Sequence, residues 1–449
     1  FSRISLEYHT TNEFRRGGNK FDLQPHETDI TEQTKHIINS GGLTYDVFFN
    51  EYKHKLSVYA SAQHTDRDSY YGADKAENAY GKTNDLTAVG GAMYVGNMDN
   101  CLFSPATFTG GLEYQYNSLH DVMTGYGRDL RQDVKIASGF VQNEWKLDYF
   151  TILAGFRLDK HNLVDNVIFS PRINTLWKPS DKFQGRLTWS TGFRAPQAYD
   201  EDLHVAAVGG EAMEVRLAEG LKPERSNSFS GSVDWSFNFG HFQSNLLIEG
   251  FYTALNDVFY LESLGKDPVS GTLVQERRNG NGARVYGANI DYKIAHGKEA
   301  QLQLGFTVQR SRYTEAVRWS EDEDVAAIKR MPRTPDYYGY FTFSSAPLKN
   351  FDFSLSGVYT GRMIVPHFAG YIEKDRLEHT PDFMDFNLKL NYTFVLNDHL
   401  KLQVNGGVQN IFNAFQKDLD KGMNRDSKYF YGPTQPRTCL LYTSPSPRD

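Results

Sequence analysis

Apolar and polar side chains alternate along most of this chain, and residues 385–404 show the pattern clearly. Apolar residues occupy every second position there: Phe386, Leu388, Leu390, Tyr392 and Phe394. Because side chains of a β-strand alternate between its two faces, this stretch predicts a strand with one apolar and one polar face. Asn397 and Asp398 favour a turn, and the alternation resumes from Leu400. The stretch therefore predicts an antiparallel hairpin.

The same pattern recurs from end to end and predicts an all-β fold. A second hairpin is expected over residues 283–309, with amides and glycines on its polar face. Further alternating segments cover residues 2–8, 55–63, 87–95, 135–145, 150–158, 182–193, 229–237, 337–343 and 351–359. In total we expect roughly 17 strands of about ten residues, the length of a tilted strand that crosses a bilayer.

The connections between these segments differ in length on the two sides of the hairpins. Long polar segments cover residues 70–85, 124–133, 195–224, 313–333, 366–382 and 414–438, whereas the other connections are short. This asymmetry predicts a transmembrane antiparallel β-barrel with a lipid-facing outside and a wet lumen. Bilayer hydrocarbon offers the backbone no hydrogen bonds, so such a sheet has to close. The alternative is a soluble sandwich or solenoid, although no fixed-period repeat supports a solenoid.

A barrel assigns opposite surroundings to neighbouring residues of one strand. Leu388 is expected to face lipid and Lys389 the lumen. An arginine in place of Leu388 should cost about 2–4 kcal/mol, while an arginine at Asn391 should be tolerated.

Composition removes several other classes of protein. The longest apolar stretches, such as residues 149–156, are far shorter than the roughly 18 residues of a membrane helix. The net charge of −7 and the lack of a basic cluster give no reason to expect nucleic-acid binding. Cys101 and Cys439 are the only cysteines, too few for a disulfide framework. Phosphate-loop, zinc-protease and nucleophile-elbow motifs are incomplete or missing, so we do not expect an enzyme.

The last residues of the chain, 439–449, stand apart from the rest. Their sequence CLLYTSPSPRD breaks the alternation and corresponds to one reading frame of a transposase sequencing adapter. We therefore expect residues 439–449 to be a non-native tail. Thr438 would then be the last native residue, and residues 1–438 would form a single unit.

Two segments on either side of a predicted long loop carry a recognisable motif. The first contains Phe193, Arg194, Ala195 and Pro196, and the second contains Leu221, Lys222, Pro223 and Glu224. This pair resembles the mid-barrel signature of TonB-dependent outer-membrane receptors. Segments that begin at Asn279, Val408 and Tyr429 resemble further parts of the same family.

The resemblance implies an architecture and a location. Receptors of this family have a 22-stranded barrel filled by an N-terminal plug domain, and a segment that contacts TonB. By this resemblance the chain is a truncated part of such a barrel, with the plug domain, some early strands and the final strand absent. It would lie in the outer membrane of a Gram-negative bacterium, in contact with lipid, and would reach TonB through the missing N-terminal part.

The resemblance also implies uptake of a scarce, bulky nutrient without a required cofactor. A ferric siderophore or cobalamin is the expected ligand, with a haem receptor or a passive porin-like channel as alternatives. His204 lies where haem receptors of the family place a ligand histidine, and a neutral imidazole suits iron. Against haem, Ala218–Leu221 replace the N-P-N-L element of those receptors.

Aromatic and acidic residues of the long loops add weaker candidates. Tyr199, Tyr429, Phe430 and Tyr431 could stack on a planar or aromatic ligand, although anchoring at the membrane interface explains these aromatic residues equally well. Arg194 is expected to order the lumen wall. A calcium site in the extracellular loops is also considered. Its oxygen ligands would be Asp418, Asp420, Asn424 and Asp426, although their spacing does not match that of an EF-hand.

Overall fold

The computed structural model describes residues 1–197, 206–207, 211–266, 273–320, 322–397, 400–422, 424–426 and 428–447. Most of them belong to one antiparallel sheet of 19 strands. The only helical elements in this described part are the 3-10 turns η1 (Pro25–Glu27) and η2 (Thr124–Tyr126). No helix within these ranges has the length and apolar character needed to cross a membrane.

The strands of the large sheet follow one another in chain order, and each pairs antiparallel with the next. The three-residue strand β18 is an exception, because it pairs with β17 beside β19. The strands are β1 (Ser2–Gly18), β2 (Ile30–Phe49), β3 (His54–Ala73), β4 (Tyr80–Cys101), β5 (Ser104–Met123), β6 (Arg128–Lys146), β7 (Phe150–His161), β8 (Ile168–Ser180), β9 (Phe183–Arg194), β12 (Glu224–Phe239), β13 (Phe242–Asn256), β16 (Ala283–His296), β17 (Ala300–Val317), β18 (Ile328–Arg330), β19 (Tyr337–Leu348), β20 (Phe351–Thr360), β23 (Phe383–Val395), β24 (Leu400–Gln409) and β25 (Thr438–Pro447).

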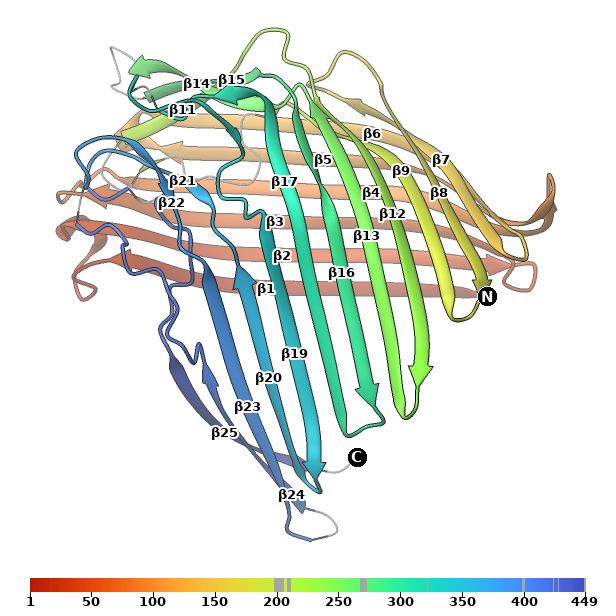
Figure 1. Cartoon of the computed structure of the whole chain (residues 1–449). Coiled ribbons are helices and arrows are strands. Elements are labelled where there is room, and N and C mark those ends of the chain that lie inside the picture. Colours follow the sequence, from red (N-terminus) through yellow and green to blue (C-terminus); the bar gives the residue numbers. More distant parts are fainter. Residues whose placement is uncertain are drawn as a thin grey trace.

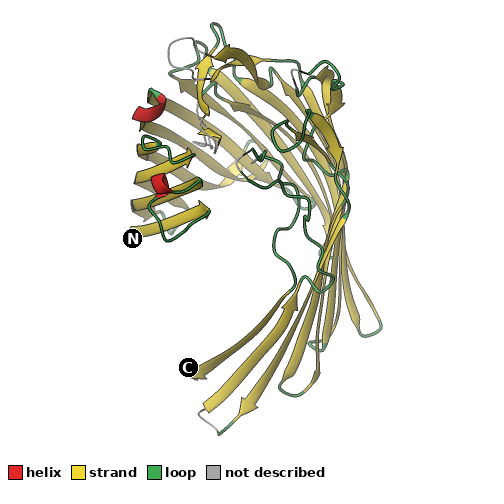
Figure 2. Cartoon of the chain, turned by 90° about the vertical axis from the view of Figure 1, so that its left-hand side faces the viewer, coloured by secondary structure: helices red, strands yellow, loops and turns green. Residues whose placement is uncertain are grey.

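The sheet curls into a wall that stays open between its first and last strands (Figures 1 and 2). Among the described residues, β1 pairs with β2 alone and β25 with β24 alone. The all-β antiparallel prediction is confirmed. The described sheet does not close into a barrel, and the total of 22 strands and the plug domain stay predictions.

Two of the predicted long loops are mostly strand. Residues 70–85 contain the end of β3 and the start of β4, and residues 124–133 contain the start of β6. The longest strand, β4, has 22 residues, about twice the predicted length. The predicted loops and strand lengths were wrong at these strand ends. Where water reaches both faces of a sheet, strands can pair through their backbones without alternating apolar and polar side chains.

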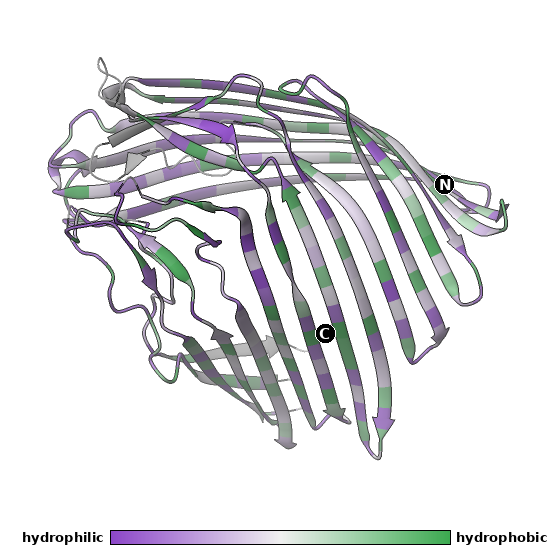
Figure 3. Cartoon of the chain, turned by 45° about the horizontal axis from the view of Figure 1, so that its top comes forward, coloured by the Kyte–Doolittle hydropathy of each residue, from purple (hydrophilic) through white to green (hydrophobic). Residues whose placement is uncertain are grey.

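The alternation predicted from the sequence sorts onto two faces of the sheet. In the hairpin of β23 and β24, Phe394 lies opposite Leu402 and Tyr392 opposite Val404, as expected. We call this apolar side the outer face; on it Leu390, Tyr392 and Phe394 are 41–46% exposed. Bands of apolar and polar residues alternate along the strands in Figure 3. The inner face is polar, and on β12 it carries Ser226, Ser228, Ser230, Ser232 and Ser236.

Long and short connections lie at opposite ends of the strands. The short ones include residues 102–103, 181–182, 240–241 and 349–350. The long ones include residues 195–223, 257–282, 318–336, 361–382 and 410–437, and we call their side of the sheet the loop end. Two small sheets lie within these loops: β10 (Ala206–Ala207), β11 (Glu211–Leu217), β15 (Leu273–Asn279) and β14 (Phe259–Lys266) form one, and β21 (Ile364–His367) and β22 (Arg376–His379) form the other.

The predicted non-native tail forms most of β25. Cys439 lies opposite Val408 of β24 in an antiparallel register. Backbone groups at the edge of a sheet accept a neighbouring strand with little regard to its side chains. The pairing therefore does not test where residues 439–449 come from, and their non-native origin stays a prediction.

Candidate functional site

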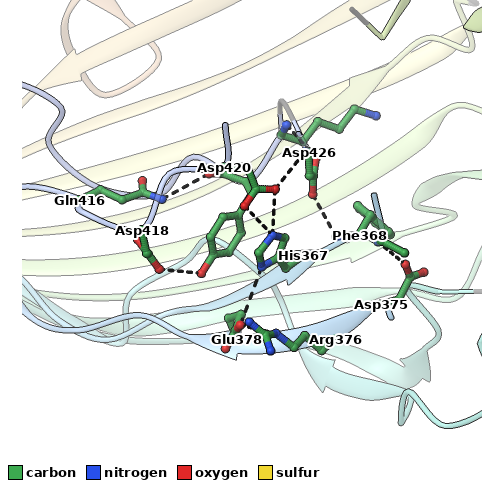
Figure 4. Close-up of polar contacts among 12 residues, drawn as sticks. His367, Phe368, Asp375, Arg376, Glu378, Gln416, Asp418, Asp420 and Asp426 are labelled. Carbon is green, nitrogen blue, oxygen red and sulfur yellow. Dashed lines mark hydrogen bonds and ion pairs between the residues drawn. The ribbon is translucent and has the colours of Figure 1, made fainter. Parts of the chain in front are cut away.

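Three loops of the loop end are tied together by buried polar contacts. They are residues 318–336, 361–382 and 410–437. We call the cluster between loops 361–382 and 410–437 the loop interlock, and Figure 4 shows its centre around His367. Its members are His367, Glu378, Gln416, Asp418, Asp420, Asp426, Tyr429 and Tyr431.

His367, the last residue of β21, lies at the centre of the loop interlock. Its Nε2 atom is 3.0 Å from Asp420 Oδ2, and both side chains are almost fully buried, at 3% and 2% exposure. Because a carboxylate only accepts hydrogen bonds, we assign the proton to Nε2. Nδ1 lies 3.7 Å from Glu378 Oε1, and the imidazole stacks on Tyr429 with ring centroids 3.5 Å apart. This histidine joins loop 361–382 to loop 410–437.

Asp418 accepts hydrogen bonds from two tyrosine hydroxyls. Tyr429 Oη donates over 2.9 Å and Tyr431 Oη over 2.7 Å. Burial, followed by the hydrogen bond to Asp418, raises the pKa of both phenols. Burial acts to raise the pKa of Asp418 as well, but the hydrogen bonds from Tyr431 and Tyr429 outweigh it and the pKa is lowered. The ionised carboxylate and the neutral phenols therefore stabilise one another.

These pKa shifts predict how the loop responds to pH. A carboxylate with a lowered pKa contributes stability above its ordinary value of 3.8, and the contribution is lost as pH falls through the folded-state pKa. We expect hydrogen exchange of residues 414–433, corrected for the intrinsic rate, to accelerate below that value. The Asp418→Asn variant should lack this acceleration. An identical acid response in both proteins would show that Asp418 does not stabilise the loop.

Backbone groups complete the loop interlock. Asp426 Oδ2 accepts from Phe368 N over 3.0 Å, and Asp420 Oδ2 accepts from Asp426 N over 2.9 Å. The buried Gln416 donates to the Tyr429 carbonyl and accepts from Tyr431 N. In these contacts Asp418, Asp420 and Asp426 each accept hydrogen bonds from a different set of donors.

Three of the four predicted calcium ligands are engaged within the protein: Asp418, Asp420 and Asp426 accept the hydrogen bonds described above. In the described part of the chain no three His, Cys, Asp or Glu side chains form a group suited to a metal ion. The calcium site stays a prediction.

The third loop joins through Arg333 and Ser320. The Arg333 guanidinium donates to the Phe430 carbonyl over 2.5 Å and to the Lys428 carbonyl. Ser320 Oγ donates to Asp375 over 2.6 Å. Together with His367, these contacts make the three loops one cover over part of the loop end.

The signature residues lie at the base of two other loops. Arg194 of β9 is 3.8 Å from Glu224 of β12, and Glu224 accepts from Phe259 N over 2.5 Å. Lys222 N donates to Asn279 Oδ1, while Ala195, Pro196 and Pro223 are buried. Phe193 and Leu221 flank these positions. The signature thus joins loop 195–223 to loop 257–282, and the role expected for Arg194 at the lumen wall stays a prediction.

A polar pocket of about 370 Å³ opens on the inner face near the loop end of β2 to β6. Its lining includes His36, Arg67, Gln115, Asn117 and Gln132. Arg67 is held by Asp121, a carboxylate that is 1% exposed and also pairs with Arg128 at 2.8 Å. The pocket offers donors and acceptors to a polar ligand, on a wall of paired strands that cannot shift easily.

The structure places only two of the four predicted ligand-binding residues His204, Tyr199, Tyr429 and Tyr431. His204 and Tyr199 lie outside the described residues. Tyr429 is 4% exposed, with its ring on His367 and its hydroxyl on Asp418, so in this arrangement it supports the loop and offers no free face to a ligand. Tyr431 is partly exposed.

Sequence reasoning missed His367, Gln416 and Arg333. The hydrogen-bond partner of His367 lies 53 positions away in the chain, those of Gln416 lie 13 to 16 positions away, and one of Arg333 lies 97 positions away. The one local signal for this cluster was that His367 precedes Phe368 in a polar loop. Many solvated loops contain such a pair, so it did not single out the site.

Comparisons with known proteins agree on one family. The family model "TonB dependent receptor-like, beta-barrel" matches residues 4–411. The chain is 29% identical over 172 residues to the iron-regulated outer membrane virulence protein of Vibrio cholerae serotype O1. That match covers 38% of this chain and only 25% of the Vibrio protein.

Solved structures with the same fold cover almost the whole chain. The siderophore receptor PirA of Acinetobacter baumannii is similar with a TM-score of 0.68 and 13% identity, over 99% of this chain and 71% of that one. The FrpB iron transporter of Neisseria meningitidis (F5-1 variant) is similar with a TM-score of 0.69 and 15% identity, over 99% and 70%. At such low identity these likenesses establish the fold alone.

Proposed function

Because this chain belongs to the family of TonB-dependent receptors and lies in a Gram-negative outer membrane, we propose that it serves the uptake of a ferric siderophore. The observation that carries the proposal is the family match over residues 4–411. The Vibrio relative is named as iron-regulated, and the similar structures include a siderophore receptor and an iron transporter. Energy would come from TonB through a part of the protein outside this chain.

The described residues suggest how a ligand would be held. Ligand would enter at the loop end, beside the cover made by loops 318–336, 361–382 and 410–437, and reach the polar pocket on the inner face. Ferric siderophores carry many oxygen atoms, which an amide donor such as that of Gln115 suits. The position of Gln115 on a paired strand reduces the entropy lost on binding.

Direct binding measurements separate this ligand class from the others considered. The full-length protein in detergent would be titrated with ferric catecholate and ferric hydroxamate siderophores, cyanocobalamin and haemin, with intrinsic tryptophan fluorescence as the signal. We expect micromolar or tighter binding of about −8 kcal/mol for one siderophore class. Binding of haemin or cyanocobalamin alone would overturn the siderophore assignment. Uptake of labelled iron in cells without TonB would point to a passive channel.

The inner-face pocket gives a second test in the same assay. Gln115→Leu removes an amide from the pocket without a described hydrogen bond being lost. We expect affinity to fall about fivefold, the worth of one neutral hydrogen bond. Gln301→Leu, on the inner face at the opposite end of the strands, is the matched control. Equal effects of the two variants would place the ligand elsewhere.

A further inference from the structure

Arginines gather on the outer face of the sheet near the loop end. Arg284 of β16, Arg312 of β17 and Arg330 of β18 lie directly opposite one another on three neighbouring strands. Arg310 is two residues from Arg312 on β17, and Arg225 of β12 lies on the same face. We call these five residues the arginine row.

The register fixes which way the arginine row faces. Arg284 shares its face with Tyr286, Ile290 and Tyr292, and Arg310 and Arg312 share theirs with Phe306 and Val308. These apolar residues form the belt that faces lipid. The arginine row therefore lies at the edge of the lipid-facing belt: Arg284 is two residues from Tyr286, and Arg310 is two residues from Val308.

The charges of the arginine row are incompletely balanced. Asp336 lies 2.5 Å from Arg310 and 3.4 Å from Arg330. No acidic side chain of the described residues lies within 4.0 Å of Arg225, Arg284 or Arg312 in an ion pair, and Arg284 is exposed. Like charges directly opposite on neighbouring strands destabilise a sheet. An anion between them would remove that cost.

An apolar trough begins one residue pair from the arginine row, toward the middle of the belt. Its floor is formed by Leu187, Gly231 and Gly250, which lie opposite one another on neighbouring strands. Their cross-strand line continues through Ala288 and lies next to the line that contains Arg310. The trough has a volume of about 660 Å³, and Ile173, Trp189, Phe229 and Tyr252 form its walls. A Cβ at Gly250 would meet no atom within 4 Å, so the floor is open.

We propose that this face binds a phosphorylated glycolipid of the outer leaflet, with phosphate on the arginine row and an acyl chain in the trough. Long loops of outer-membrane barrels are extracellular, so the loop end meets the outer leaflet. Guanidinium groups bind phosphate through two parallel hydrogen bonds. The Arg310 line lies two residues, or about 7 Å, from the Gly250 line along the strands, and the Arg284 line lies four residues, or about 14 Å, from it, which suits a head group and its first methylenes.

The test is lipid binding by the full-length protein in detergent. Native mass spectrometry would count bound diphosphorylated lipid A, dephosphorylated lipid A and phosphatidylglycerol at rising salt. We expect diphosphorylated lipid A to bind best and to weaken with salt, because exposed charges are screened. Arg284→Gln with Arg312→Gln should weaken this binding at least about tenfold, as charge-assisted hydrogen bonds are lost. Gly250→Leu should weaken it by filling the trough while leaving the salt dependence unchanged.

Arg186→Gln is the inner-face control, because Arg186 is an arginine on the inner face of β9. Folding of every variant is checked by its heat-dependent migration in gels, and R284Q alone replaces the double variant if that one does not fold. Unchanged lipid A binding in the folded arginine variants would overturn the proposal. Equal loss in R186Q, or equal binding of phosphatidylglycerol, would overturn it too. None of these outcomes depends on which nutrient the receptor transports.

Discussion

Replacing His367 with alanine should release the loop interlock while the sheet stays intact. Without the imidazole, the Asp420 carboxylate, which is 2% exposed, would lose its side-chain donor and keep the Asp426 backbone amide. Breaking one side of a buried pair costs about 3–5 kcal/mol. The stacking of the ring on Tyr429 would be lost as well. We expect hydrogen exchange of residues 361–382 and 410–437 to become about 100-fold faster or more, while exchange in β20 and β23 is unchanged.

Two variants make this result specific. His379→Ala changes an exposed histidine of the same hairpin, and surface changes of this kind usually stay within about 0.5 kcal/mol. Asp420→Asn combined with His367→Ala removes the unpaired charge and should recover part of the protection. If His367→Ala and His379→Ala behaved alike, the loops would be held by other contacts, such as those of Arg333.

The lipid-facing strands were predictable because their signal is local. A period of two in apolar side chains decides which face each residue takes, and the hairpin of β23 and β24 has the predicted register. The ends of β3, β4, β5 and β6 lacked that signal, because beyond the bilayer both faces are wet and either residue type is tolerated. Backbone pairing, which the sequence does not encode locally, continues there without it.

The candidate site was predicted much less well for a related reason. The signature residues were recognisable as a motif, yet their contacts, such as Glu224 with Phe259, join loops that are separate in sequence. The acidic residues 418, 420 and 426 looked like oxygen ligands because acidic spacing alone does not reveal donors that arrive from elsewhere. His367, the two tyrosines and the Phe368 amide supply those donors, and the packing of loops 361–382 and 410–437 brings them there.

One detail of the inner face changes the choice of variants there. Asn391 is 8% exposed and donates to Asp352 over 2.5 Å. An arginine at this position would lose that bond and find little room, so the expected tolerance at Asn391 is wrong for this site. Ser356 is the better inner-face position: it pairs with Asn387 one step from Leu388, and no described hydrogen bond uses its hydroxyl.

Leu388→Arg should destabilise the barrel in lipid by about 2–4 kcal/mol, the cost of a guanidinium near the bilayer midplane. Leu388 lies opposite Leu355 of β20, in the middle of the outer face. Ser356→Arg places the same charge at the same depth on the inner face, where water reaches it, and should cost less than about 0.5 kcal/mol. Urea unfolding of the full-length protein in lipid vesicles, followed by tryptophan fluorescence, measures both. Equal losses would mean that β20 and β23 do not separate lipid from water, whereas a loss at Leu388 alone ties the period of two in the sequence to the two solvents of the sheet.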